Sequence, residues 1–263
     1  MWFPHSAMKR FPAVRPSSKS EPLPGCRLTT TASQARAALR SLRSPAVAAT
    51  TARFFKTGPG DYAAGDMFIG ITVPTLRQVA REYEGLALPQ LASLLRSKIH
   101  EERHLALLIL TRQSTQGTAR TRRTACDFYL QHTRHINNWD LVDCSAPTVV
   151  GGSFLARSRQ PLQTLARSAW LWDRRIAIVA TQHFIRHNDY ADALDISQLL
   201  LHDPEDLIHK ATGWTLREVG KKAPPLLRAF LDRHAPTMPR TMLRSCIERF
   251  APAERQDYLT RKC

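Results

Sequence analysis

The sequence predicts an all-helical protein in which helix pairs stack into a solenoid, and three observations support this fold class. From Ala32 onward, apolar residues recur at steps of three and four, as they do along one face of a helix. No two neighbouring runs show the alternation of a β-hairpin. Four segments of similar composition recur at steps of 36, 36 and 39 residues when aligned on Arg103, Trp139, Arg175 and Trp214. A period of about 40 is typical of helical repeats, whose apolar faces are buried only by their neighbours.

The first 30 residues differ from the rest of the chain. Met1–Thr30 contains five prolines and a single acidic residue, Glu21, and it lacks a long apolar stretch. This composition predicts a disordered N-terminal extension. A true start at Met8 and an organelle-targeting segment are alternative interpretations. Residues 31–263 are then expected to form a single domain.

After this extension, helices are expected to follow one another between frequent helix-breaking residues. The stretches between the breaks run roughly 10 to 16 residues, which predicts roughly twelve to fourteen helices in about six pairs. The breaks are marked by Gly85, Gly117, Pro147, Gly151, Gly152, Asn188, Pro204, Pro224, Pro225, Pro236 and Pro239.

One segment between helices is rich in glycine and aromatic residues, and it runs from Phe54 to Gly70. One interpretation is a long turn whose phenylalanines pack into the core. The other is a loop that faces the substrate and brings Lys56 and Tyr62 to it. The segment is not a P-loop, because no Gly-Lys-Ser/Thr follows its glycines at the required spacing.

Composition indicates the class of partner and the compartment. The formal net charge is +16, the sequence pI is about 10.4, and thirty arginines stand against eight lysines. This excess favours a polyanion, most simply nucleic acid, although an arginine-rich proteome would give the same composition. The absence of an apolar run of about 18 residues predicts no membrane span. Five scattered cysteines without a C-x-x-C pair indicate neither a zinc site nor disulfides, so we expect a cytoplasmic protein.

The segments at Trp139 and Arg175 contain the first candidate site residues. Trp139 and Asp143 are four residues apart and share a helix face, whereas Asp140 points elsewhere. In the next segment Trp172 and Arg175 share a face, and the Arg175 guanidinium could pair with Asp143 or reach a phosphate. The alternative is structural, with the indole packed and the carboxylate capping a neighbouring helix.

The last segment places a tryptophan between two cations. Lys210, Trp214 and Arg217 fall at i, i+4 and i+7, a stripe that suits a nucleic-acid backbone with a base or sugar against the ring. Solvated cations around a core tryptophan are the alternative. Two indoles and a carboxylate together favour a cationic substrate, because aromatic faces attract cations and a carboxylate stabilises developing positive charge. A nucleotide whose base is alkylated on a ring nitrogen has this property.

These segments resemble those of the AlkD-like DNA alkylation repair proteins, a family of HEAT-like repeat DNA glycosylases. The similarity covers most of residues 35–250 and is most specific in two motifs, Asn-Asn-Trp-Asp-x-x-Asp at residues 137–143 and Gly-Trp-x-x-Arg-Glu at residues 213–218. The resemblance implies a HEAT-like solenoid, C-shaped with a basic concave face. It also implies hydrolysis of the N-glycosidic bond of N3- and N7-alkylated purines in an open cleft.

By this resemblance, Asp143, Trp139, Arg175 and Trp214 are the expected catalytic set. We expect DNA to be contacted by Lys210, Arg217, Arg174, Arg103, Lys56 and Tyr62. The expected partner is duplex DNA with alkylated bases, bound by a nucleoid-associated monomer without metal or organic cofactor. The alternatives are a non-catalytic DNA-binding repeat protein, which would tolerate Asp143→Asn, and a protein-interaction solenoid.

Two other candidate sites find little support. His183 and His187 at i, i+4 could bind a metal, but Phe184 stands where an H-E-x-x-H motif requires glutamate. Cys144 and Ser145 have no neighbouring base in the sequence, so nucleophilic catalysis is not indicated.

Overall fold

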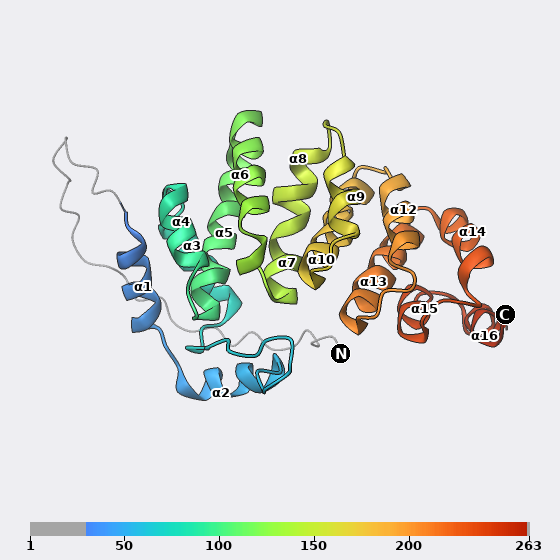
Figure 1. The fold of residues 1–263 in the computed structure, drawn as a ribbon, viewed down its shortest axis with the longest axis horizontal. Coiled ribbons are helices and arrows are strands. Elements are labelled where there is room, and N and C mark those ends of the chain that lie inside the picture. Colours follow the sequence, from blue (N-terminus) through green and yellow to red (C-terminus); the bar gives the residue numbers. More distant parts are fainter. Residues whose placement is uncertain (1–29, 262–263) are drawn as a thin grey trace, which may run out of the picture.

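A computed structural model describes residues 30–261 and shows an array of stacked helices (Figure 1). The expected disordered extension therefore lies outside the described residues except for Thr30. The first part of the array comprises α1 (Ala32–Ser41), α2 (Pro45–Phe54), α3 (Val73–Glu82), α4 (Leu88–Leu95), α5 (His100–Gln116) and α6 (Ala119–Gln131). Its centre comprises η1 (Thr133–His135), α7 (Trp139–Ala146), η2 (Pro147–Gly151), α8 (Gly152–Phe154), α9 (Gln160–Ala166), α10 (Leu171–Ala180) and α11 (Gln182–Arg186). Its last part comprises α12 (Ala191–Leu199), α13 (Asp206–Lys222), α14 (Pro224–His234), α15 (Arg240–Cys246) and α16 (Pro252–Thr260).

The first helix begins where its sequence provides a cap. Thr31 accepts a hydrogen bond from the Gln34 backbone N–H, and the Gln34 side chain accepts one from the Thr31 backbone N–H. This reciprocal pair satisfies two donors that a helix start leaves free. The array thus begins at Ala32, where the apolar spacing starts.

Four inner helices carry the four aligned segments. Helix α5 contacts α7, α7 contacts α10, and α10 contacts α13. Arg103, Trp139, Arg175 and Trp214 lie on these four helices in that order. Outer helices pack against them, with α6 on α5, α9 on α10 and α12 on α13. The helical-repeat fold predicted from the 36- to 39-residue period is therefore confirmed. None of the described helices is long and apolar enough to cross a membrane.

The helix stop predicted at Pro147, Gly151 and Gly152 is wrong, because the chain stays helical through these residues; a second helical run is interrupted only at Thr181. Pro147 opens the π-helical segment η2, which connects α7 to α8 without leaving helical backbone angles. Thr181 separates α10 from α11, and its hydroxyl donates to the Ile178 carbonyl oxygen. Proline lacks the N–H that the regular ladder needs, which explains the local widening at Pro147. Counted as continuous runs, the α-helices of the described part number fourteen, within the predicted range.

The core is divided into two main clusters of buried apolar side chains. The larger cluster extends from Ala32 on α1 to Ala211 on α13. The smaller one joins α13 to the C-terminal helices, from Leu201 to Tyr258. Each helix pair is thus buried mainly by its neighbours, as a repeat array requires.

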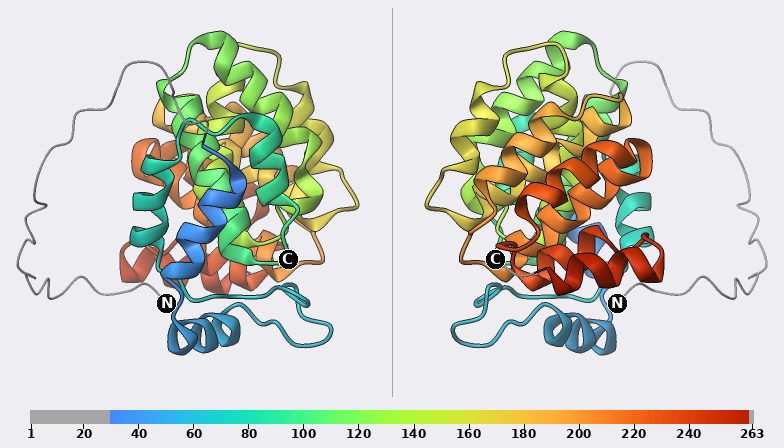
Figure 2. Two further views of the ribbon diagram at one scale, coloured as in Figure 1. Left: turned by 90° about the vertical axis from the view of Figure 1, so that its left-hand side faces the viewer. Right: turned by 90° about the vertical axis from the view of Figure 1, so that its right-hand side faces the viewer.

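Helix α2 and the following segment, residues 55–72, lie along one edge of the array in all views (Figures 1 and 2). At the far end of this loop, Gly70 has φ +81°, and a Cβ there would overlap the Ser44 carbonyl oxygen. The Glu101 carboxylate at the start of α5 accepts hydrogen bonds from the backbone N–H groups of Ile69, Gly70 and Ile71. The loop is therefore fastened to the inner helix layer.

Candidate active site

A cleft of about 680 Å³ lies between the loop and the N-terminal ends of α10 and α13. The loop side is formed by Phe54, Lys56 and Tyr62, and the helix side by Trp139, Arg175 and Lys210. Five of these six were predicted as site residues, and they come from four separate stretches of the chain. The loop is thus both packed and cleft-facing, because Phe55 is buried whereas Lys56 is exposed.

Arg175, which lines this cleft, forms a bidentate ion pair with Asp143, which is not among the lining residues. Arg175 Nε lies 2.9 Å from Asp143 Oδ1, and Nη2 lies 2.8 Å from Oδ2. The third guanidinium nitrogen donates to the Leu207 carbonyl oxygen at 2.6 Å. The Arg175 side chain is 6% exposed and that of Asp143 is 21% exposed, so the carboxylate keeps some contact with solvent.

The protonation of Asp143 reflects two opposing effects. Burial raises the pKa of its carboxyl above the ordinary value, and the nearby Asp140 charge adds to this, while the Arg175 guanidinium opposes both. A carboxylate accepts hydrogen bonds at about four lone-pair positions. Arg175 occupies one position on each oxygen, which leaves the others available to a ligand or a water molecule.

Trp139 is held against the loop by aromatic contacts. Its ring stacks on Phe55, with centroids 5.1 Å apart, and it meets Phe54 edge-on at 5.8 Å. The indole Nε1–H donates to the Tyr62 hydroxyl at 3.2 Å. Tyr62 in turn meets the buried Trp172 edge-on at 6.2 Å. The position of the Trp139 ring at the cleft therefore depends on the loop.

The last aligned segment contributes less to the cleft. Lys210 lines it and is exposed, with an ion pair to Asp206 at 2.7 Å. Trp214 is half-buried, packs against the larger core cluster and is not among the residues that line the cleft. Along the predicted stripe, exposure therefore falls from Lys210, which is exposed, through Trp214 to Arg217, which is buried.

Three arginines expected to contact DNA are paired within the protein. Arg103 lies 2.7 Å from the Asp66 carboxylate and is buried. Arg174 lies 2.6 Å from Asp203, with 12% of its side chain exposed. Arg217 is also buried, and its Nη1 donates to Glu248. Since these guanidinium groups already have carboxylate partners, they are not included in the site proposed below.

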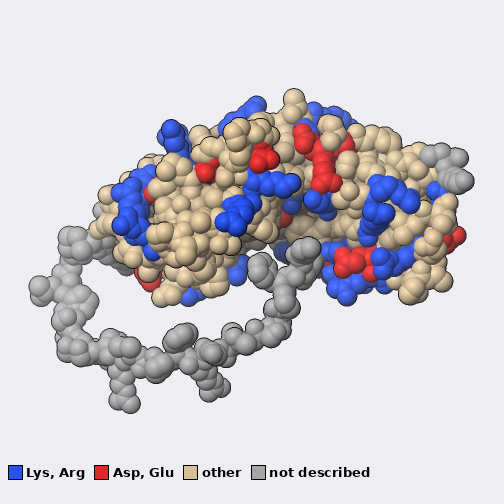
Figure 3. Space-filling view, turned by 90° about the horizontal axis from the view of Figure 1, so that it is seen from below, with Lys and Arg blue, Asp and Glu red and all other residues tan. Residues whose placement is uncertain are grey.

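The charges around the cleft are balanced. The charged residues that line it divide equally between the two signs: Lys56, Arg175, Lys210, Asp61, Glu205 and Asp206. Seen from the side on which α2 lies, basic side chains form separate groups with acidic side chains between them (Figure 3). A C-shaped array with a basic concave face stays a prediction.

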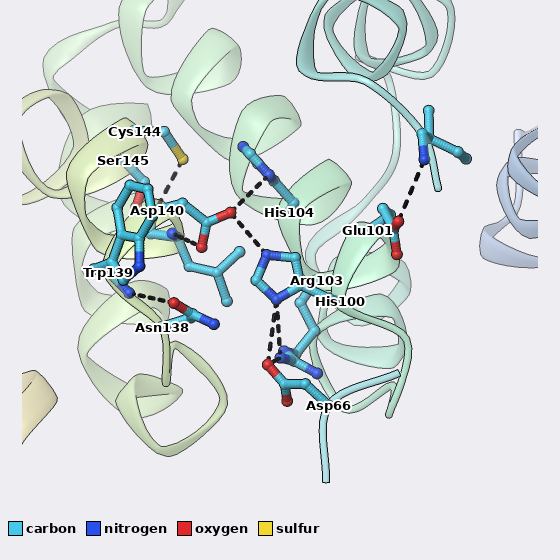
Figure 4. Close-up of polar contacts among 12 residues, drawn as sticks. Asp66, His100, Glu101, Arg103, His104, Asn138, Trp139, Asp140, Cys144 and Ser145 are labelled. Atoms are coloured by element: carbon cyan, nitrogen blue, oxygen red, sulfur yellow. Dashed lines mark hydrogen bonds and ion pairs between the residues drawn. The ribbon is translucent and has the colours of Figure 1, made fainter. Parts of the chain in front are cut away.

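A buried polar network beside Trp139 was not predicted as a site. His100 on α5 bridges two carboxylates, with Nε2 2.7 Å from Asp140 Oδ2 and Nδ1 3.3 Å from Asp66 Oδ2 (Figure 4). His104 Nδ1 lies 3.5 Å from the same Asp140 oxygen, while its Nε2 is buried without a hydrogen-bond partner. Asp140 therefore points away from Asp143, as expected.

The two histidines of this network have opposite pKa shifts. Burial alone would lower the pKa of His100, but the Asp140 and Asp66 carboxylates raise it to about 9. Burial lowers the pKa of His104 to about 4, against the attraction of Asp140. The ligand-type atoms of His100, His104 and Asp140 lie within 4.8 Å of one another, a spacing that could hold a metal ion. Both His100 nitrogens already face carboxylates, so the cluster as it stands is an ion-paired bridge between the loop and α7.

The sequence contained a signal for this network. The 36-residue step that aligns Arg103 with Trp139 also aligns His104 with Asp140. Polar residues in register on adjacent repeats face each other. A base and an acid in register therefore indicated a contact between α5 and α7.

Comparison with known proteins identifies the relatives of this chain. A family model described as DNA alkylation repair enzyme matches residues 35–250. A comparison with curated proteins gives no match. Among solved structures, a predicted DNA alkylation repair enzyme from Enterococcus faecalis is similar in fold, with a TM-score of 0.61 and 16% identity. That alignment covers 80% of this chain and 97% of the other.

Proposed function

Because this chain belongs to the DNA alkylation repair enzyme family, we propose that it is a DNA glycosylase that hydrolyses the N-glycosidic bond of cationic N3- and N7-alkylpurines in duplex DNA. The family supports a role in DNA repair. The observation that carries the finer proposal is the Asp143–Arg175 ion pair, whose arginine lines the cleft together with Trp139.

The proposed reaction needs a negative charge close to the sugar. Alkylation of a purine ring nitrogen makes the base a cationic leaving group. When the bond from C1′ to the base nitrogen breaks, its electron pair goes to the base and the sugar becomes oxocarbenium-like. A carboxylate fixed in a partly desolvated site stabilises such a charge more strongly than one in water. Asp143 fits this role, and its free lone pairs can hold the water that adds to C1′ and then loses a proton.

Arg175 acts in this proposal as a positioning residue for Asp143. Its two parallel N–H donors favour the ionised carboxylate and oppose the effect of burial, which raises the pKa of Asp143, and they fix its orientation. The bond to the Leu207 carbonyl oxygen holds the guanidinium itself. The geometry is thus set before a ligand arrives, which lowers the cost of reorganisation.

The aromatic side of the cleft would contact the damaged nucleotide. Trp139 and Tyr62 present polarisable ring surface, which attracts a cationic base. Lys56 and Lys210 are exposed at the rim and would contact phosphates. Trp214 is half-buried, and we propose that it supports the N-terminal part of α13, which lines the cleft. Because the proposed partner is DNA, we propose that the protein acts in the cytoplasm at the nucleoid.

The test is release of 7-methylguanine or 3-methyladenine from methylated duplex DNA. We expect Asp143→Asn to lower the rate by roughly 100-fold or more, the scale of loss when a preorganised group that stabilises transition-state charge is removed. Binding of the same duplex should change little. Asp206→Asn is the control, since it removes a carboxylate charge that lines the cleft and is paired with Lys210 rather than with Arg175.

Two outcomes would overturn the proposal. Background release by the wild type, together with retained binding, would indicate the non-catalytic DNA-binding alternative. Equal release by the wild type and Asp143→Asn would exclude Asp143 from the chemistry.

A further inference from the structure

A second groove lies at the opposite end of the inner helices from the cleft. It has a volume of about 760 Å³ and is formed by the end of α5, the start of α6, α8 and α11. The helices that form it, α6 and α8 among them, lie on the side of the array away from α2 (Figure 1). Trp139 at the cleft and Gly152 at this groove are at opposite ends of one continuous helical run. Thirteen residues at 1.5 Å each separate them by roughly 20 Å.

The groove is the more strongly basic of the two sites. Four arginines line it, Arg120, Arg122, Arg123 and Arg157, and no aspartate or glutamate does. The cleft, by contrast, is lined by equal numbers of cations and anions. Part of the +16 excess of the chain is thus concentrated away from the proposed active site.

Two of these arginines are available to a ligand. Arg120 is exposed and has no hydrogen bond or ion pair with any described residue. Arg123 has one distant carboxylate neighbour, Asp127, at 4.0 Å, and both side chains are largely exposed. This differs from Arg103, Arg174 and Arg217, whose guanidinium groups are held by internal carboxylates.

The other two arginines are placed by the protein. Arg122 Nη1 donates to the Gly117 carbonyl oxygen at 2.9 Å. Arg157 Nη1 donates to the Ser153 hydroxyl at 2.9 Å, and its guanidinium lies 5.0 Å from the centre of the Phe154 ring. Each uses one or two of its five N–H donors in this way, so the remaining donors can face the groove.

A buried hydroxyl gives an independent indication of a ligand. Ser114 lines the groove and is fully buried, yet its Oγ has no hydrogen-bond partner. Buried hydroxyls are normally bonded, so an unpaired one beside a groove indicates a missing partner, which a water molecule or a ligand oxygen can supply. The first turn of α6 adjoins it and contains no acidic residue. Thr118 caps the Thr121 N–H, and the uncapped backbone N–H groups of this turn favour an anion.

We propose that this groove binds the phosphate backbone of a second nucleic-acid segment, separate from the one at the cleft. Arginine forks, hydroxyls and helix N–H groups are the donors that proteins use for phosphate oxygens. No phenylalanine, tyrosine or tryptophan is among the residues that line the groove, and its one ring, His183, is stacked on His187, so the contact is to the backbone and is independent of sequence. Because duplex DNA stays nearly straight over lengths below about 150 base pairs, the segment at the cleft does not reach the opposite ends of the helices. The chain would then hold two DNA segments at once.

The test is the number of short undamaged duplexes bound per chain. A duplex of about 12 base pairs is roughly 40 Å long at 3.4 Å per base pair, too short to bend around the array. Sedimentation at saturating duplex should give two per chain for the wild type. The double variant Arg120→Gln/Arg123→Gln should bind one. The matched control is Arg40→Gln/Arg43→Gln, which removes the same charge from two exposed positions at α1.

The control should bind two duplexes, and the groove variant should excise alkylated bases at the wild-type rate. Asp143→Asn should lose excision but still bind two duplexes. This result would test the proposed glycosylase activity without affecting the proposed second DNA site. A single duplex on the wild type would overturn this proposal. So would a groove variant that binds as many duplexes as the control.

Discussion

The Asp143–Arg175 pair joins three of the inner helices through one set of contacts. Asp143 lies on α7 and Arg175 on α10, and Arg175 also bonds to the Leu207 carbonyl oxygen on α13. A bidentate guanidinium fixes both distance and orientation, which lysine could not do. The charge proposed for catalysis is therefore also part of the packing between repeats.

Replacing Arg175 should affect stability and chemistry together. In Arg175→Gln the carboxylate stays largely buried without its partner, and breaking such a pair costs about 3 kcal/mol or more. The pKa of Asp143, already raised by burial, should rise further once the guanidinium that opposes the rise is gone. Urea unfolding should show the loss of stability. The acid limb of the excision rate against pH should move to higher pH.

The double variant Asp143→Asn/Arg175→Gln provides the control for this prediction. Removing the carboxylate charge should restore part of the lost stability, because no unpaired ion is then left buried. An Arg175→Gln variant as stable as the wild type would show that the pair contributes nothing to the fold.

At the residue scale, the sequence predicted contacts within a repeat period and missed those outside it. Trp139, Asp143 and Arg175 were found because helical spacing and a 36-residue step place them on adjacent faces. The partners of Arg103, Arg174 and Arg217 could not be found in this way. Their partners Asp66, Asp203 and Glu248 lie in the long loop, between α12 and α13, and just after α15.

At the scale of elements, the loop of residues 55–72 positions the aromatic side of the cleft. Glu101 fastens its end through three backbone N–H groups, and His100 fastens Asp66 in its middle. Both anchors come from the first turn of α5. The sequence predicted the helices from their apolar spacing, but loop anchoring depends on long-range polar contacts that carry no periodic signal.

Two glycines of this loop allow a matched test of that anchoring. Gly60 and Gly70 have nearly the same φ, +85° and +81°. An added Cβ meets nothing at Gly60, whereas at Gly70 it overlaps the Ser44 carbonyl oxygen. Gly60→Ala should therefore cost only the left-handed conformation, about 1 kcal/mol. Gly70→Ala should cost more, since α2 must also move, and it should lower excision by displacing the residues that support Trp139.

Urea unfolding of the two variants measures the difference directly. Gly60→Ala serves as the control for the backbone angle alone. Equal losses of stability in the two variants would mean that Ser44 and α2 can move away from an added Cβ at no cost. The loop would then not be rigidly fastened.

At the scale of the whole molecule, many arginines hold one repeat against another. Arg36 on α1 pairs with Glu102 on α5 at 2.8 Å. Arg159, just before α9, lies 2.6 Å from both Asp189 and Asp192. These pairs are partly buried, with the Glu102 side chain only 2% exposed, so they are shielded from solvent more than ordinary surface pairs are. Net charge alone could not predict which arginines remain free, and these include Arg120 at the second groove as well as Arg40 and Arg43 at α1.

The stability of the whole chain should depend on pH through the two histidines on α5. His100 has a folded pKa of about 9 against 6.5 when unfolded, so its contribution is full below pH 6.5 and is lost as pH rises to 9. His104 has a folded pKa of about 4, because the fold favours the neutral ring. The unfolded chain binds a proton here first, so stability is lost as the pH falls from 6.5 toward 4. Each of these two pH ranges changes the free energy of unfolding by about 3 kcal/mol. The free energy of unfolding should therefore be greatest near pH 6.5.

Variants of the two histidines separate the limbs and act as controls for each other. His100→Gln should flatten the loss between pH 6.5 and 9 while keeping the acid limb, because a glutamine bridges the carboxylates without binding a proton. His104→Gln should do the reverse. The buried thiols Cys126 and Cys246, whose pKa values are raised, also contribute to the pH dependence of stability. This contribution is the same in each variant and in the wild type, so it cancels when their unfolding free energies are compared. An alkaline limb that persists in His100→Gln would assign the pH dependence to other groups. The bridge between loop and α7 would then not rest on a charged imidazole.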